Sequence, residues 1–326
     1  MTAADWRPSS SVAAAMRRAQ ALGAARRFFA ERGVLEVDTP LLSGTTVSDP
    51  HIESIAVTLA RKPGRRYFLQ TSPEFFMKRL LSAGYPDVYQ ICKAFRDGEA
   101  GPRHSPEFTL VEWYRLGYGL RQMMEETTAF ITALIAPQCV TGPPAFIEYD
   151  EAFGRYADID PGRAPLSALK KAADPDPRLV ASLGADRDAW LDLLLTLRVI
   201  PRFAAGRLTV LYHYPASQAA LARLCPANAT AADRFEVFYA DLELANGFVE
   251  LKDANEQARR FERDRASRRE RGQPVHATDR RLLAALESGL PDCAGVAVGF
   301  DRVLMIGEMA EDIRQVQTFA FDEDDA

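Results

Sequence analysis

KAFRDGEAGPRHSPEFTLVEWYR, residues 93–115, is the stretch around which the rest of the chain is organised. It starts inside an apolar run, Val88–Phe95, which predicts a strand, and a second strand is predicted from Glu107 onward. In the polar loop between them, Gly98 and Gly101 permit a tight turn and a close approach of the backbone to a ligand. The stretch therefore predicts a hairpin with a ligand-binding loop, although taken alone it fits a plain hairpin with a charged tip better.

The loop and the returning strand carry side chains that suit a nucleotide and an amine. Arg96 and Arg103 supply forked donors that match phosphate oxygens. Alternation along the returning strand puts four side chains on one face: Phe108, Leu110, Glu112 and Tyr114. A ring on this face can stack on a base, and an acid beside a phenol can hold an ammonium group.

The other elements follow from apolar periodicity and from glycine and proline punctuation. Gly33 is expected to end the first helix, and Pro40 a short strand after it. Helices are expected over 12–32, from Ser72, over 120–136, as short pieces over 147–203, over 255–272 and from Phe300, and strands over 34–40, 55–59, 67–70, 208–214, 235–251 and 295–299.

A helix start at Ser72 offers polar groups to a substrate amine. Ser72 suits the N-cap, Pro73 the first helical position and Glu74 the first turn. Taken alone, Glu74 fits better as a carboxylate that complements the helix dipole.

The run FEVFYADLELANGFVEL, residues 235–251, is predicted as one long strand with three polar groups. Strict alternation would put Glu243 opposite to Asn246 and Glu250. A bulge at Gly247 would turn these groups toward one another, and two acids near a phosphate suit Mg²⁺. Without the bulge, both acids are solvent-facing groups of an edge strand.

Two arginine-bearing helices stand out near the end of the chain. Arg302 falls in the first turn of a helix, where the dipole disfavours a cation, so a facing nucleotide would explain it. Residues 259–271 are rich in arginine, and the default interpretation of such a run is a solvated helix face. The alternative is a surface that binds an acidic partner. Reversing the charges of Arg268 and Arg269 would test that alternative.

Composition bounds the class of protein. The 326 residues are 47% hydrophobic, enough for a sizeable core, and the net charge of −5 argues against a surface built mainly for nucleic acid. The four cysteines are widely spaced, which indicates reduced thiols. No apolar run approaches the roughly 20 residues of a membrane span, so a cytoplasmic protein with no membrane association is expected.

Several of these motifs together resemble the class II aminoacyl-tRNA synthetases. FRDGE…RHSPEFTLVEWY resembles their second signature, GVAVGFDR the third and VLEVDTP the first. SPEFFMKRLL, HSPEFTLVEWY, ELANGFVEL and GFDR, in that order, resemble lysyl-tRNA synthetases. The segment YHYPASQAALA, and Ala297 where lysyl-tRNA synthetases have glycine, resemble their free-standing paralogues that ligate (R)-β-lysine to elongation factor P.

The resemblance implies an α+β fold: the class II catalytic core, an antiparallel sheet flanked by helices. It implies one catalytic domain over 1–326, a helical insertion over roughly 150–205, no OB-fold anticodon-binding domain, and a homodimer built by the first signature.

The resemblance also implies roles for individual residues. Arg96 would hold the α-phosphate of ATP, Arg302 and Phe108 would sandwich adenine, and His104 would lie over the nucleotide. Glu243 and Glu250 would serve Mg²⁺ and substrate. The remaining nucleotide contacts would be Asp97, Gly98, Glu99, Ser105, Leu244 and Gly299, and the remaining substrate contacts Ser72, Pro73, Glu74, Glu112, Tyr114, Asn246 and Ala297.

Two departures from the family pattern concern the nucleotide loop. The usual arginine-x-glutamate is Arg96-Asp97-Gly98 here, with Glu99 one position late, and Ser105 stands where asparagine is usual. A shifted loop path, helped by Gly98, would let Glu99 replace the missing acid.

The implied activity is ATP-dependent activation of (R)-β-lysine or lysine and its transfer to a lysine of elongation factor P, with no tRNA partner. Two alternatives stay open: a lysine-activating paralogue with another acceptor, and a non-catalytic binding module. The choice between lysine and (R)-β-lysine also stays open.

Overall fold

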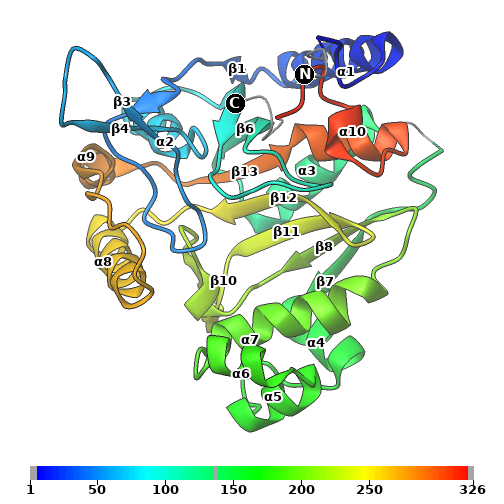
Figure 1. Ribbon diagram of the computed structural model, residues 1–326, viewed down its shortest axis with the longest axis vertical. Helices are drawn as coiled ribbons and strands as arrows, with labels where there is room; N and C mark the ends of the chain where they lie inside the picture. Colours follow the sequence, from blue (N-terminus) through cyan, green and yellow to red (C-terminus); the bar gives the residue numbers. More distant parts are fainter. Residues whose placement is uncertain (1–5, 136–137, 322–326) are drawn as a thin grey trace, which may run out of the picture.

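The computed structural model describes residues 6–135 and 138–321 and is built on an eight-stranded sheet (Figure 1). The strands in spatial order are β1 (Leu35–Glu36), β5 (Val88–Phe95), β6 (Glu107–Leu116), β13 (Cys293–Gly299), β12 (Leu242–Val249), β11 (Arg234–Tyr239), β8 (Leu208–Tyr212) and β7 (Ala145–Glu148). The pairs from β5 through to β8 are antiparallel, and the two outer pairs are parallel. The expected antiparallel sheet of an α+β fold is confirmed.

One face of the sheet is covered by α1 (Val12–Ala30), α3 (Leu120–Leu134) and α10 (Phe300–Glu308). The core between them is aromatic: Phe29 of α1 and Phe130 of α3 pack on Trp113 of β6 at ring-centroid distances of 5.2 and 5.0 Å. Ser11 caps α1 by accepting the Ala14 N–H at 3.1 Å. This face is closed by packing, so a site must lie on the other one.

The short helices expected over 147–203 lie at the bottom of Figure 1, between β7 and β8. They pack around a second core that contains Phe153, Leu169 and Trp190. They are α4 (Tyr149–Ala157), α5 (Leu166–Ala173), α6 (Pro177–Leu183) and α7 (Arg187–Leu194), followed by single turns at Leu195–Val199 and Ile200–Arg202.

At the left of Figure 1, three helices and a small sheet border the open face. The helices are α2 (Glu74–Ser82), α8 (Ala254–Glu270) and α9 (Arg280–Gly289), and the sheet has the order β2 (Leu42–Ser43), β4 (Arg66–Leu69) and β3 (Ala56–Thr58). A hairpin of β9 (Leu224–Cys225) and β10 (Asn228–Ala232) and two short 3₁₀ turns, Ala216–Gln218 and Ile313–Gln315, complete the described elements. None of the helices in the described ranges combines the length and apolar character that crossing a membrane requires.

Some expected boundaries are wrong. The strand expected over 235–251 is two strands, because the chain turns at Ala240, whose φ is +49°. The strand expected over 34–40 keeps only the two residues of β1. Pro73, not Ser72, is the N-cap of α2, although Ser72 Oγ still accepts the Glu74 N–H at 3.2 Å. The third helix ends at Leu134, and Ala136 lies outside the described residues.

The bulge in β12 is at Leu244 and not at Gly247. Val237 of β11 pairs with Ala245 and Phe238 pairs with Glu243, so Leu244 is the extra residue. Gly247 pairs regularly and is glycine because a Cβ there would come within 2.5 Å of the Phe235 ring. The displaced bulge still has the expected effect, since it puts Glu243 on the same face as Asn246.

Candidate active site

A row of side chains crosses the open face of the sheet from strand to strand. The register aligns Gln90 with Glu112, Glu112 with Ala297, Ala297 with Asn246, and Asn246 with Glu236. Directly paired residues point to the same side of a sheet, so these groups line one surface. Five strands, from β5 to β11 in spatial order, thus contribute to one site.

At the α2 end of this surface, a buried lysine lies between two glutamates. Lys78 Nζ is 2.6 Å from Glu74 Oε1 and 2.6 Å from Glu250 Oε2, and the Lys78 side chain is 2% exposed. Burial alone would lower the Lys78 pKa, but Glu250 and Glu74 outweigh it and raise the pKa above its usual value. Lys78 is therefore a fixed cation at the base of the site.

A third buried carboxylate, Glu112, faces the same cluster. Its Oε1 accepts the Tyr114 hydroxyl at 2.8 Å, and its Oε2 has no hydrogen-bond partner. Burial, reinforced by Glu74, raises the Glu112 pKa to about 8. Burial also raises the pKa of Glu250 to about 7 against the attraction of Lys78.

The cluster is short of a cation. Two carboxylates, Glu74 and Glu250, pair with the one ammonium group, and the charges of all three glutamates influence one another. One oxygen each of Glu112 and Glu250 has no partner among the described residues. Buried charges require partners, so a second ammonium group fits here chemically. Gly295 keeps the space open, because a Cβ there would lie 2.7 Å from Glu250 Oε1 and would also strike the Tyr114 ring.

At the other end of the surface, Arg302 gathers three segments. It donates to the Glu243 carbonyl at 3.0 Å and to the Arg103 carbonyl at 3.2 Å, and its Nη2 lies 2.7 Å from His104 Nε2. Burial and the Arg302 charge lower the His104 pKa, so this imidazole is neutral and can accept from Arg302. These contacts explain why an arginine stands at the start of a helix. Arg302 holds the loop between β5 and β6 against β12.

Arg96 and Phe108 form a half-buried stack beside this loop. The Arg96 guanidinium carbon is 5.1 Å from the Phe108 ring centroid, and Glu99 Oε1 is 3.4 Å from Arg96 Nη1. Arg96 Nε is buried and has no hydrogen-bond partner among the described residues. An arginine with unused donors beside an aromatic face fits a nucleotide phosphate and base.

The other predicted nucleotide contacts are at or near this end. Gly98 turns the loop with a φ of +75°, and the Asp97 N–H donates to the Glu53 carbonyl at 2.9 Å. Ser105 is buried and its hydroxyl has no partner. Gly299 pairs with Leu110 in the sheet. The Leu244 side chain packs in the core, so only its main chain could contact a ligand.

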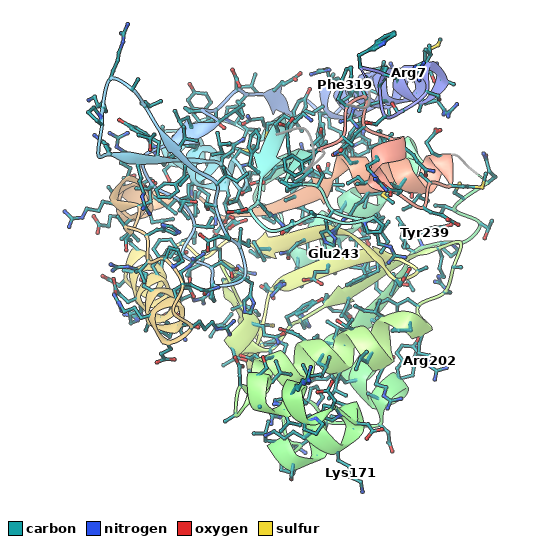
Figure 2. The ribbon with its side chains drawn as sticks, in the orientation of Figure 1. Arg7, Lys171, Arg202, Tyr239, Glu243 and Phe319 are labelled. Atoms are coloured by element: carbon teal, nitrogen blue, oxygen red, sulfur yellow. The ribbon has the colours of Figure 1, made fainter. Side chains whose placement is uncertain are left out.

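Glu243 and Glu250 are separated along the open face, and the expectation that both bind one metal ion stays a prediction. They lie seven positions apart along an extended segment with one bulge, roughly 20 Å at the usual strand rise. Glu250 is enclosed with Lys78, whereas the Glu243 side chain is 45% exposed and lies at the middle of the sheet (Figure 2). Burial, reinforced by the charge of Glu236 of β11, raises the pKa of Glu243. The cation nearest to the Glu243 carboxylate is Arg302 Nη1, 3.8 Å away. At that distance the carboxylate is still available to bind Mg²⁺.

Besides Gln90, four contributors to the site were not anticipated. Lys78 has a sequence signal, since it is four residues after Glu74 in a helix and flanked by buried Met77. Arg234 and Glu236 adjoin Asn246: Arg234 donates to Asn246 Oδ1 at 3.3 Å and to Glu236 Oε1 at 2.5 Å. Gly295, the fourth, has a role that only the tertiary structure shows.

Within the arginine-rich run 259–271, Arg260 and Arg268 of α8 are buried. Arg268 is fully buried, so reversing its charge would disrupt the fold instead of testing a surface. Arg259 and Arg263 both pair with Glu256, and Arg265 pairs with Glu262. Arg269 remains exposed.

A separate cluster, His213, Cys225 and Asp233, brings possible metal ligands within 4.8 Å of one another. Asp233 is already paired with Arg223 at 2.7 Å, and His213 lies 3.7 Å from Asp233 and 3.5 Å from Glu148. Since a resident arginine repels a cation, we interpret this cluster as a structural ion-pair network.

Comparisons with known proteins agree with these features. The family model for class II tRNA synthetases (D, K and N) matches residues 2–323. The elongation factor P–(R)-β-lysine ligase of Klebsiella pneumoniae (strain 342) is 45% identical over 98% of both chains. Proteins of the same name from Klebsiella pneumoniae subsp. pneumoniae and Salmonella paratyphi B are 44% identical over the same share. The similarity thus includes every strand of the row and both ends of the site.

Proposed function

The chain belongs to the class II tRNA synthetase family (D, K and N), and we propose that it is an ATP-dependent ligase for elongation factor P. It activates (R)-β-lysine, or lysine, and transfers it to a lysine side chain of that protein. The observation that carries the proposal is the buried cluster of Glu74, Glu112 and Glu250 around Lys78, which lacks one cation. The names of the relatives, matched over 98% of their length, support the acceptor.

The cluster recognises the distal ammonium group of the amino acid. Glu112 and Glu250 offer their unpaired oxygens, and the Tyr114 hydroxyl holds Glu112 in place. An uncharged side chain would leave these oxygens buried and unpaired, which costs about 1–3 kcal/mol or more for charged groups. The cluster therefore selects lysine-like side chains.

The opposite end holds ATP. Arg96 binds the α-phosphate with its free donors, and Phe108 and Arg302 flank the adenine. When bound, Mg²⁺ neutralises phosphate charge, and the half-exposed Glu243 is the carboxylate placed to hold it.

The reaction needs positioning and charge stabilisation. A carboxylate oxygen of the amino acid attacks the α-phosphorus, the bond to pyrophosphate breaks, and an aminoacyl-adenylate forms. The neutral acceptor lysine nitrogen then attacks the carbonyl carbon, AMP leaves with the electrons of the bond to its phosphate oxygen, and the new amide nitrogen loses one proton to solvent. Arg96 stabilises the charge that develops on the α-phosphate, and no side chain has to act as a nucleophile.

Amino-acid binding should depend on pH, because the raised pKa values of Glu112 and Glu250 mean that both gain protons in the empty site near neutrality. An incoming ammonium group favours their carboxylate forms. The KM for the amino acid should therefore fall as pH rises from about 6 to 8, and binding should release protons. Titration calorimetry in buffers of different ionisation enthalpy measures that release, which Glu112→Gln should reduce. If Glu112→Gln releases as many protons as the wild type, Glu112 is not a source of the released protons.

A two-fold homodimer through the first-signature region, Arg26 to Pro40, is part of the proposal. Apolar side chains are exposed around it: Val12 is 80%, Met16 60% and Leu35 45% exposed. Light scattering at micromolar concentration should give twice the chain mass, and Met16→Glu with Leu35→Asp should shift the mass toward the monomer. A monomer mass for the wild type would contradict this.

Activation is tested by ATP–pyrophosphate exchange with a panel of amino acids and Mg²⁺. Exchange that requires lysine or (R)-β-lysine supports the ligase. Exchange that is absent with every lysine isomer would favour the alternative of a non-catalytic binding module.

A further inference from the structure

A nine-residue segment between β2 and β3, residues 46–54, forms a strap between α8 and the nucleotide loop. Its ends are joined by a 2.5 Å contact between the hydroxyls of Thr46 and Ser54, both buried. In Figure 1 this part of the chain descends from β2 toward α8. Its Ser48 hydroxyl donates to Asp264 Oδ2 of α8 at 2.6 Å.

Arg268 of α8 holds the strap by hydrogen bonds to its main chain. All five N–H donors of its guanidinium are used, and the residue is fully buried. The acceptors are the carbonyls of Ser48 (3.0 Å), Asp49 (2.8 Å), Ile52 (2.6 Å) and Pro274 (3.0 Å) and Oε2 of Glu53 (2.8 Å). Gln273 adds a bond to the Pro50 carbonyl at 2.9 Å. Four strap carbonyls therefore bond to the end of α8 or to the residues just after it.

The far side of the strap pairs with the nucleotide loop. The Glu53 carbonyl accepts the Asp97 N–H at 2.9 Å in an isolated antiparallel bridge. Asp97 directly follows Arg96, and Gly98 turns the loop immediately afterwards. Glu53 thus binds Arg268 through its side chain and the nucleotide loop through its main-chain carbonyl.

We propose that Arg268 is a positioning residue for ATP: it fixes the strap, and the strap sets the place of Arg96 through the Glu53–Asp97 bridge. The inference rests on the proposed function only in taking ATP as the ligand of Arg96. Arg268 touches no substrate atom itself. Catalytic contacts tolerate little misplacement, since a shift of about 1 Å can cost on the order of 100-fold in rate.

The ammonium cluster shares none of these contacts. Lys78 pairs with Glu74 and with Glu250. Within residues 6–135 and 138–321, the hydrogen bonds of Arg268 go to the strap and to Pro274, not to this cluster. Loosening the strap should therefore weaken ATP binding and leave amino-acid binding nearly unchanged.

Arg268→Lys tests this split, since lysine keeps the charge but has three donors in place of five. In the exchange assay, the KM for ATP should rise about tenfold or more, while the KM for the amino acid stays within about twofold. Arg269→Lys, at the exposed neighbouring position, is the matched control and should change neither. If Arg268→Lys only lowers the amount of active protein and leaves both KM values unchanged, Arg268 is merely structural. An equal rise in the KM for ATP and in the KM for the amino acid would also overturn the proposal.

Direct ATP binding separates this inference from the proposed function. If the wild type shows no exchange with any lysine isomer, the ligase proposal fails, and calorimetric ATP affinities decide the inference. Binding by Arg268→Lys that is about tenfold weaker than the wild type sustains it. Equal affinities, or a wild type that does not bind ATP, overturn it.

Discussion

Arg302→Ala is expected to abolish most of the ATP–pyrophosphate exchange. Losing a charged contact in a desolvated site costs about 2–5 kcal/mol, which corresponds to roughly 30-fold to several thousandfold in kcat/KM. Alanine removes the bonds to the Glu243 and Arg103 carbonyls and the contact with His104 at the same time. The nucleotide loop then loses its attachment to β12.

The measurement is exchange at varied ATP, with Arg178→Ala as the control because Arg178 lies exposed in the helical region between β7 and β8. Arg302→Lys should recover little, since lysine lacks the fork that reaches several acceptors. A loss below threefold in Arg302→Ala would remove Arg302 from the nucleotide site.

The largest effect on stability is expected for Lys78→Met. Breaking a buried ion pair by removing one partner costs about 3–5 kcal/mol, because a charge is left uncompensated. Here Glu74 and Glu250 both lose the one cation that pairs with them in the part of the chain that the structure describes. Urea unfolding near neutral pH should show the loss. Lys93→Met, whose exposed pair with Glu107 spans 3.0 Å, should lose less than about 1 kcal/mol.

The deficit of Lys78→Met should shrink in acid. Without the ammonium group, the pKa of Glu250 rises further above its unfolded value. A carboxyl with a raised folded pKa contributes its stability below the unfolded pKa, about 4.3, and loses it as pH rises through the folded pKa. The variant should therefore recover relative to the wild type as pH falls toward about 7, the folded pKa of Glu250 in the wild type, below which Glu250 is protonated in both proteins. A deficit independent of pH would mean lost packing and no uncompensated charge.

The sequence predicts the central hairpin and its open face well. The bounds of β5 and the start of β6 agree with their apolar and alternating patterns, and Tyr114 does bond to Glu112 as neighbours on one strand face. The turn between β11 and β12 was missed because Ala240 takes a left-handed conformation that favours glycine or asparagine. With no such residue present, the run looks like one strand.

The buried cations were harder to predict. Lysine and arginine are almost never fully buried unless they are paired, so the sequence predicts no role for Lys78, and a solvated face is the default interpretation of the run that contains Arg268. Glu250 and the strap carbonyls that pair with them lie more than 170 positions away in the sequence. Only the tertiary structure brings such partners together, and it also separates Glu250, which pairs with Lys78, from Glu243, which lies beside Arg302.

The most direct test of the proposed ligase is the mass of elongation factor P after incubation with the purified protein, ATP, Mg²⁺ and (R)-β-lysine. The account predicts a single addition of one lysyl group on one lysine of elongation factor P, which requires ATP and is lost in Arg302→Ala. An unchanged mass under conditions where exchange is active would contradict the proposed acceptor, and efficient charging of tRNA would assign the adenylate to a different acceptor.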